Sequence, residues 1–453
     1  MGESYSIPGV YRRPQTRAEG FARVRTDIAG FVGAVGPQHL GQAIAVDDWK
    51  SYVAEFRQDR FGQPILAVEG GSIETAARDF FANGGRRLWI VNVAQRIDPD
   101  HAQEFLNDML GIGRSIEPHG LELLLRQDEV SLVALPDFDA VIRATDDDGE
   151  IVDLPGDPCF RPCGIARRAL PFAQHRAVPR EVTERLFGSE DLIWAQRYLI
   201  ERLRRESWRW FGILAPPPGC DAEAAVTWRR RLTAGSEGSS VAALYWPWLL
   251  TQDSPGAPTV IRSPVGAVAG VFAATDIAEG PSAAPAAKRL LGVVGLDVTV
   301  GDHENRTAYD AGVNVIRALP GRGILIWGAR TLLWQDEMSR AEPLAFVNAR
   351  RCLSAIARSA WVVGQPLVFQ PNTTLPRIRL HQLMTGYLLQ VFAAGALMGD
   401  TPDQGFFVEV EPAEFSPEGQ LVCRIGVALA APAEFIVFRI GRASGVIEIA
   451  EAA

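Results

Sequence analysis

The chain has 453 residues, of which 47% are hydrophobic and 22% are charged, and its formal net charge at pH 7 is −9. This length allows two or three domains with sizeable cores, and the composition is that of an ordinary globular protein. The negative charge argues against nucleic acid as a bulk partner. No apolar run is long enough to span a membrane, and the first residues lack the basic and apolar regions of a signal peptide.

The first part of the chain predicts strands that alternate with helices. Residues 1–25 contain two prolines and show no periodicity, which predicts an extended arm. The run from Asp27 to Val35 is typical of a buried strand. Helices are expected at 49–56, 72–85 and 99–110, and further strands at 86–94 and 130–136. This order of strands and helices indicates a largely parallel sheet covered by helices.

The alternation weakens over residues 137–190, which are rich in Asp, Pro and Arg, and we interpret this stretch as loops of an insertion. It resumes with a helix at 190–206. The expected elements that follow are a strand at 210–216, a helix at 221–234, a strand at 240–248, a short helix at 266–276, and two strands at 314–320 and 324–330 around a Gly-Arg-Gly turn.

The last third of the chain predicts two helices and three strands. In the first helix, 344–363, apolar residues occupy one side, and Arg350, Arg351 and Arg358 are expected elsewhere on its surface. The second helix has one buried stripe at the spacing i, i+3, i+4, i+7, formed by Leu380, Leu383, Met384, Tyr387, Leu388, Val391 and Phe392. Strands are expected at 421–429, 435–440 and 446–450. The last strand has no obvious local partner and is suited to pairing with another chain.

The sequence predicts no catalytic residue, no cofactor and no metal. Neither lysine follows a glycine, so a phosphate-binding P-loop is excluded, and the motifs G-x-G-x-x-G, H-E-x-x-H and G-x-S-x-G are absent. The six histidines do not cluster. The five cysteines are scattered, which indicates unpaired thiols in a reducing compartment rather than disulfides or zinc. An enzyme with a site dispersed over distant loops remains a remote alternative.

Several segments, in this order, resemble contractile phage tail sheath proteins and their relatives in bacterial contractile injection systems. They are PGVY (8–11), 26–56, FFANGGRRLWIVNVA (80–94), FGILAPPPG (211–219), AALYWPWL (242–249), 263–276, 314–332, FVNARR (346–351), 395–410 and AEFIVFRIG (433–441). Two features depart from the family. Arg12, Arg13 and Pro14 stand where acidic residues are usual, and 137–204 has no counterpart.

The resemblance implies an α/β fold with an outer domain, sometimes called subtilisin-like, that has a largely parallel sheet. It also implies a smaller inner α+β domain that touches a tube, and extended terminal arms. The expected limits are 1–25 for the N-terminal arm, 26–136 and 205–335 for the outer domain, 137–204 for the insertion, 336–441 for the inner domain and 442–453 for the C-terminal arm strand.

The function implied is that of a structural subunit, not an enzyme, that polymerises as stacked rings around an inner tube and contracts to drive the tube through a target envelope. Its partners would be other copies of itself, the inner tube protein, and baseplate and cap components, without nucleic acid or membrane insertion. It would assemble in the bacterial cytoplasm as part of a phage tail or of an extracellular or cytoplasmic tail-like particle. The alternative is an end-specific sheath-like paralogue in the same particle.

Two sets of residues are predicted to carry this function. The arms are expected to add strands to neighbouring subunits through Pro8, Gly9, Val10, Tyr11, Val446, Ile447, Glu448 and Ile449. Contacts to an acidic tube are expected from Arg350, Arg351, Arg358, Arg377 and Arg379, on the assumption that these side chains face outward.

Overall fold

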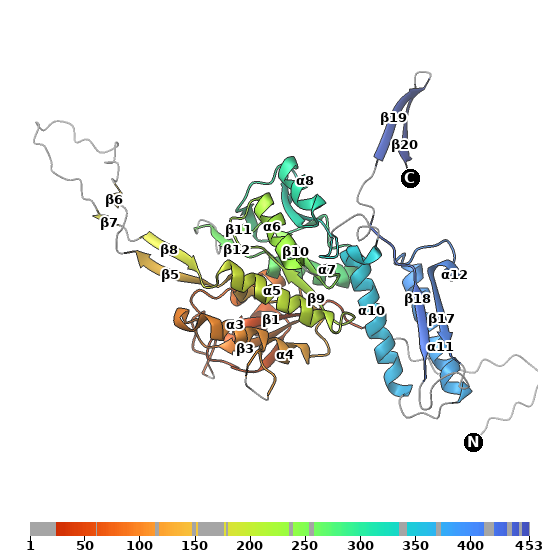
Figure 1. Cartoon of the computed structure of the whole chain (residues 1–453), viewed down its shortest axis with the longest axis horizontal. Coiled ribbons are helices and arrows are strands. Elements are labelled where there is room, and N and C mark those ends of the chain that lie inside the picture. Colours follow the sequence, from red (N-terminus) through yellow and green to blue (C-terminus); the bar gives the residue numbers. More distant parts are fainter. Residues whose placement is uncertain are drawn as a thin grey trace, which may run out of the picture. The chain divides into compact units, whose positions relative to one another are not determined.

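The computed structural model divides the chain into two compact units (Figure 1), the larger containing Arg25–Ala355 together with residues 431–453 and the smaller containing Ile356–Ala430. The structure describes residues 24–59, 61–113, 117–146, 151–152, 176–177, 180–234, 239–252, 258–334, 342–367, 373–411, 421–432, 437–443 and 446–452.

A nine-stranded sheet forms the centre of the larger unit. Its strands, in spatial order, are β13 (Lys288–Arg289), β16 (Gly323–Trp327), β15 (Asn314–Leu319), β10 (Ala242–Trp246), β9 (Phe211–Leu214), β4 (Leu132–Ala134), β1 (Ala29–Ala34), β3 (Leu88–Ala94) and β2 (Ala43–Val46). The strands from β15 to β3 run parallel, whereas β2, β16 and β13 pair antiparallel at the two edges. The predicted largely parallel sheet is therefore confirmed.

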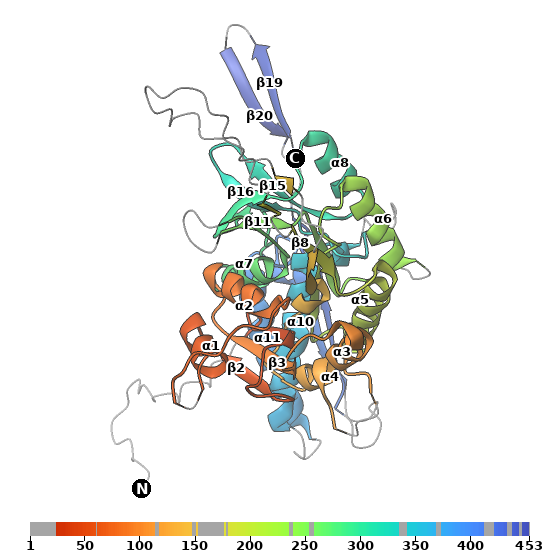
Figure 2. The same cartoon turned by 90° about the vertical axis from the view of Figure 1, so that its left-hand side faces the viewer.

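Helices cover both faces of this sheet (Figure 2). One face packs against α1 (Trp49–Phe56), α2 (Ile73–Ala82) and α7 (Val265–Ala278), and the other against α3 (Ala102–Leu110), α4 (Gly120–Leu125), α5 (Ser189–Arg204), α6 (Ala222–Thr233) and α8 (Asp302–Asp310). Successive strand residues point to opposite faces, so Phe31 joins the first core and Val32 the second. Both faces are apolar because both are buried.

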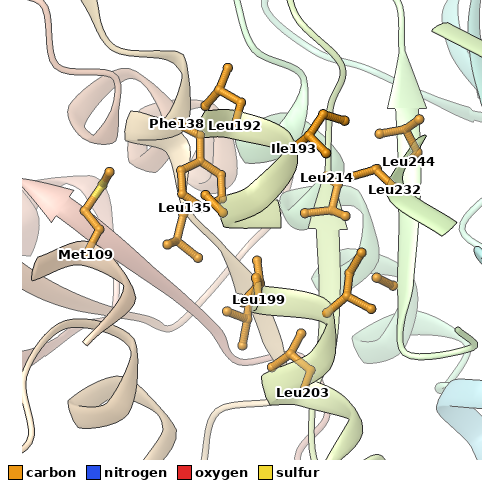
Figure 3. Packing of buried hydrophobic residues seen from close by; sticks show 14 of the residues in the cluster. Met109, Leu135, Phe138, Leu192, Ile193, Leu199, Leu203, Leu214, Leu232 and Leu244 are labelled. Carbon is orange, nitrogen blue, oxygen red and sulfur yellow. The ribbon is translucent and has the colours of Figure 1, made fainter. Parts of the chain in front are cut away.

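The second core brings together leucines and other apolar residues that lie far apart in the sequence. Figure 3 shows Leu199 and Leu203 on α5 and Leu214 on β9 among the side chains of this cluster. All three are at most 2% exposed. Helix α5 is therefore part of the core of the larger unit.

Two glycines allow α7 to pack directly on the backbone of α2. A Cβ atom added at Gly266 would lie 2.4 Å from the carbonyl oxygen of Ala76, and one at Gly270 would lie 2.4 Å from that of Phe80. Neither position has room for a methyl group. The Gly-x-x-x-Gly spacing places both glycines on the same face of α7.

We expect Gly270→Ala to lower the free energy of unfolding by about 3 kcal/mol, because the added methyl group forces the two helices apart. Gly386→Ala in the smaller unit is the matched control, since that helical glycine has no neighbouring atom within 4 Å of an added Cβ. The control should raise stability by about 0.5–1 kcal/mol. Urea unfolding measures both, and equal effects of the two substitutions would contradict this packing.

Smaller sheets and turns complete the larger unit. A three-stranded sheet contains β12 (Val260–Arg262), β11 (Leu249–Thr251) and β14 (Val293–Leu296), and two-stranded pairs join β5 (Val141–Asp146) to β8 (Arg180–Arg185), β6 (Ile151–Val152) to β7 (Arg176–Ala177) and β19 (Val437–Ala443) to β20 (Val446–Ala452). Among the described residues, the 3-10 turns of this unit are η1 (Pro99–His101), η2 (Pro136–Asp139) and η3 (Pro343–Ala345), and η4 (Gln365–Leu367) belongs to the smaller unit.

The smaller unit contains the second half of α10 (Val347–Gly364), α11 (Thr374–Ala393), α12 (Pro402–Gly405) and the antiparallel pair β17 (Phe406–Val410) and β18 (Cys423–Val427). Helix α11 buries Leu380, Met384, Tyr387 and Leu388, which belong to the stripe predicted from the sequence. The Ser359 and Tyr387 hydroxyls lie 3.2 Å apart and link α10 to α11.

The structure differs from the expected limits of the insertion and of the inner domain. Residues 189–204 form α5 in the main core, and Asp137 and Phe138, at the start of the expected insertion, are also buried. The smaller unit begins at Ile356, within α10, rather than at 336. The physical reason is that apolar side chains on one face of α5 and on the first half of α10 pack into the larger unit.

Candidate functional site

Four of the five arginines predicted to contact a tube are buried inside the chain. Arg350, Arg351, Arg358 and Arg377 are only 5–7% exposed, and Arg379 on α11 is exposed. The prediction that these four side chains lie at the surface was therefore wrong. Their charge suggested solvent, but polar partners distant in sequence hold several of them inside.

For Arg350, Arg351 and Arg377, the hydrogen-bond partner lies in the same unit as the arginine. Arg351 forms a bidentate ion pair with Asp276 at 2.8 and 2.5 Å. Arg350 donates to the Ser354 hydroxyl at 3.0 Å, and burial lowers the pKa of Arg350 to about 10. In the smaller unit, Arg377 donates to the main-chain carbonyl oxygen of Glu411. These side chains fix the helices that carry them.

The outer side of α11 carries an exposed stripe with two leucines that the sequence analysis missed. Leu375, Arg379, Gln382, Gly386 and Leu389 follow the spacing i, i+4, i+7, i+11, i+14 and share one face, called the α11 outer face below. All five are exposed, Leu375 by 75%. The only signal in the sequence was that Leu375 and Leu389 lie off the buried stripe.

Gly386 is unusual on this face. A glycine in the middle of a helix costs about 1 kcal/mol relative to alanine. Its usual justification is close packing, yet no atom of the described chain lies within 4 Å of a Cβ built there. Close approach of another molecule would account for it.

Further large apolar side chains are exposed in the smaller unit. They are Trp361, Val362, Ile378, Met398 and Phe407. Phe407 lies on β17, whose pairing with β18 makes a sheet of only two strands in the described chain. A two-stranded sheet is marginally stable by itself, and its outer edges offer unpaired main-chain groups. Additional strands would complete it.

The predicted arm residues divide into two groups. Pro8, Gly9, Val10 and Tyr11 lie outside the described residues. Val446, Ile447, Glu448 and Ile449 lie in β20, which pairs with β19 in an antiparallel hairpin. The expectation that this strand lacks a local partner was therefore wrong, because Val437–Ala443 lies close enough in the chain to pair with it.

A cavity of about 540 Å³ opens in the larger unit between the loop Leu66–Ser72 and β12. Trp248, Val141 and Asp139 also line it. Asp139 lines the cavity, and burial raises its pKa to about 7, although the charge of Arg185 favours its ionised form. The cavity thus combines an apolar wall with a carboxyl group that titrates near neutral pH.

We expect the free energy of unfolding to decrease as the pH rises from about 4 to about 7, because of the raised pKa of Asp139. The pKa of Asp139 is higher in the folded chain than the ordinary value of 3.8, so the folded chain holds a proton that the unfolded chain releases. The resulting stabilisation is complete below about pH 4 and is lost as the pH rises through about 7. Asp139→Asn should remove this contribution, so its free energy of unfolding should gain on the order of 4 kcal/mol relative to wild type between about pH 4 and pH 8, at about 1.4 kcal/mol for each of about three pKa units.

Urea unfolding measures the free energy of unfolding of wild type and of Asp139→Asn across this pH range. Asp403→Asn is the control substitution, since Asp403 is exposed. Parallel pH curves for wild type and Asp139→Asn would contradict the assignment.

Among the described residues, no group of three or more His, Cys, Asp or Glu side chains is arranged to hold a metal ion. In the same part of the chain, no helix is both long and apolar enough to cross a membrane.

Residues 196–332 match the family described as phage tail sheath protein central domain. This segment begins in α5, ends just after β16 and supplies half of the central sheet with its covering helices α6, α7 and α8. Comparison with curated proteins gives no match.

The fold resembles three solved assemblies along nearly the whole chain. The anti-feeding prophage baseplate in the contracted state gives a TM-score of 0.66 at 21% identity, covering 97% of this chain and 99% of that chain. The anti-feeding prophage helical sheath in the contracted state gives 0.64 at 22%, covering 97% and 100%. The PVC sheath complex of an extracellular contractile injection system, also contracted, gives 0.63 at 19%, covering 98% and 99%.

The matched family and structures are structural sheath proteins rather than enzymes. The resemblance predicted from the ordered segments is confirmed. The chain thus contains a segment that matches the phage tail sheath central domain, and it has the fold of contractile sheath proteins.

Proposed function

We propose that the chain is a structural subunit of a contractile sheath that polymerises around an inner tube and contracts to drive the tube through a target envelope. The observation that carries this proposal is the phage tail sheath central domain at residues 196–332, within a fold that matches sheath proteins over at least 97% of the chain. Its assembly would take place in the bacterial cytoplasm, with baseplate and cap components at the two ends.

The smaller unit is the proposed region of assembly. Leu375 and Leu389 give the α11 outer face two exposed apolar side chains, Gly386 leaves room for close approach, and Arg379 adds one positive charge. Such a face is suited to an apolar tube surface with an acidic residue opposite Arg379. Arg379 is the one residue retained from the predicted set of tube contacts.

Strand addition is the proposed link between copies. The pair β17–β18 has outer edges that no strand of the described chain covers, and the chain supplies the hairpin β19–β20 and the segment around Pro8–Tyr11 as possible donors. Main-chain hydrogen bonds from added strands would join subunits while each subunit moves as a body.

Contraction in this proposal uses stored free energy and no chemical step. If the contracted arrangement is favoured by on the order of 1–3 kcal/mol per subunit, the total over many copies becomes large, because identical interfaces switch together.

The second candidate is an end-specific sheath-like subunit near the baseplate. It is favoured by one observation, which is that an anti-feeding prophage baseplate structure also matches the chain, with a TM-score of 0.66. Such a subunit would be present in few copies.

Electron microscopy of the full chain, expressed alone and with the tube protein of its own particle, distinguishes the candidates. Long hollow polymers support the main sheath, and discrete rings support the end-specific subunit. A monomer under both conditions, with no binding to tubes, would refute both.

A further inference from the structure

One buried guanidinium, that of Arg351, joins three parts of the larger unit. Arg351 lies in the first half of α10 and is 5% exposed. It donates to both carboxylate oxygens of Asp276, near the end of α7, at 2.8 and 2.5 Å. It also donates to the carbonyl oxygen of Thr26 at 2.8 Å.

Thr26 is held from several sides at the point where residues 1–25 reach the fold. Its carbonyl oxygen accepts a second hydrogen bond from the Ser131 hydroxyl, and its own side chain hydrogen-bonds Asp276. The next residue, Asp27, is paired with Arg25 at 3.1 and 2.6 Å. Thr26 is therefore tied to α7, to α10 and to the residue that precedes β4.

A contribution to the stability of the fold does not account for the buried Arg351–Asp276 ion pair. The side chains of Arg351 and Asp276 are 5% and 2% exposed, so both charges lose their hydration on folding. A buried ion pair replaced by apolar side chains of similar size often leaves stability unchanged or improved. A bidentate pair that also binds a carbonyl group does fix geometry, since the planar guanidinium accepts only a narrow range of partner positions.

The location of the pair suggests which geometry is fixed. The second half of α10 belongs to the smaller unit, and Thr26 directly follows residues 1–25 in the sequence. The pair therefore holds the first half of α10 and the residue next to the proposed N-terminal arm, and the proposed sheath function assigns contacts with other molecules to that arm and to the smaller unit.

We propose that the Arg351–Asp276 pair is a positioning anchor, which holds the origin of the N-terminal segment and the base of α10 in one fixed arrangement so that both engage neighbouring molecules together. Arg351 and Asp276 act in this role through Thr26 and α10 and contact no partner themselves. The assembly part of this inference rests on the proposed sheath function, whereas the anchoring part does not.

The test replaces both charges together, with Arg351→Met and Asp276→Leu in the full chain, because removing one alone would leave a buried unpaired charge. Amide hydrogen exchange over residues 25–31 measures anchoring. A matched control is Arg202→Met with Glu122→Leu, which removes a bidentate pair of 2.5 and 2.9 Å between α5 and α4.

We expect the double variant to keep its Tm within about 2 °C, to exchange residues 25–31 at least about tenfold faster, and to form at least about tenfold less sheath polymer. The control should leave exchange at 25–31 unchanged. Unchanged exchange in the double variant would overturn the anchor, and faster exchange with normal polymer would overturn its role in assembly. If the wild-type chain forms no polymer, the proposed function fails, while the exchange result still decides the anchor.

Discussion

Asp137→Ala should lower the free energy of unfolding by about 4 kcal/mol, because it leaves three main-chain N–H groups, two buried and one partly buried, without an acceptor. The Asp137 carboxylate accepts from the N–H of Ala34 at 2.6 Å, of Ser72 at 2.6 Å and of Ile73 at 3.0 Å. It is fully buried. The side chain thus caps α2 and holds the end of β1 at the same time.

The fit around this carboxylate is close. A Cβ atom at Gly33 would lie 2.3 Å from Oδ2 of Asp137, so the strand must have glycine there. Asp137→Asn is the matched control, since the amide keeps one acceptor oxygen and should cost roughly half as much. Urea unfolding at about pH 8 measures all three proteins. A loss below about 1 kcal/mol for Asp137→Ala would contradict the role assigned to this residue.

The second large effect is expected at the α11 outer face. Gly386→Trp should abolish binding of the chain to the inner tube, because a bulky side chain would stand where close approach is proposed. The free subunit should lose little stability, since the space around Gly386 is open. Co-sedimentation with preformed tubes measures binding, and thermal unfolding measures stability.

His381→Trp is the matched control for this substitution. His381 is exposed on the same helix but lies roughly 140° around its axis from Gly386. It should leave tube binding within about twofold of wild type. Arg379→Glu tests the electrostatic part separately, and we expect binding to weaken about tenfold. Normal tube binding by Gly386→Trp would contradict the proposal that the α11 outer face contacts the tube.

The fold could be predicted from the sequence where local periodicity determines it. The strand at β1 and the helices α2 and α7 follow directly from apolar runs and spacing, and their order predicts the parallel sheet. Helix α5 was also predicted, but its place in the core was not. Its buried Leu199 packs beside β9, a contact that no local pattern encodes.

The candidate site was predicted less well, and the arginines show why. Polarity predicted Arg351 and Arg377 at the surface. Their partners, Asp276 and the Glu411 carbonyl group, are 75 and 34 residues away in the chain. Burial of a charge depends on such long-range pairing, which one sequence does not reveal. Leu375 shows the opposite case, an apolar side chain that the sequence analysis did not single out and that is 75% exposed.

The most direct test of the central claim is electron microscopy of particles that contain this chain, imaged before and after a contraction trigger such as acid or denaturant. The proposed function predicts that the chain forms a hollow helical polymer around a tube, which changes from a long, narrow form to a short, wide form with the same number of subunits. A polymer of one fixed length and width under all conditions, or none at all, would contradict it.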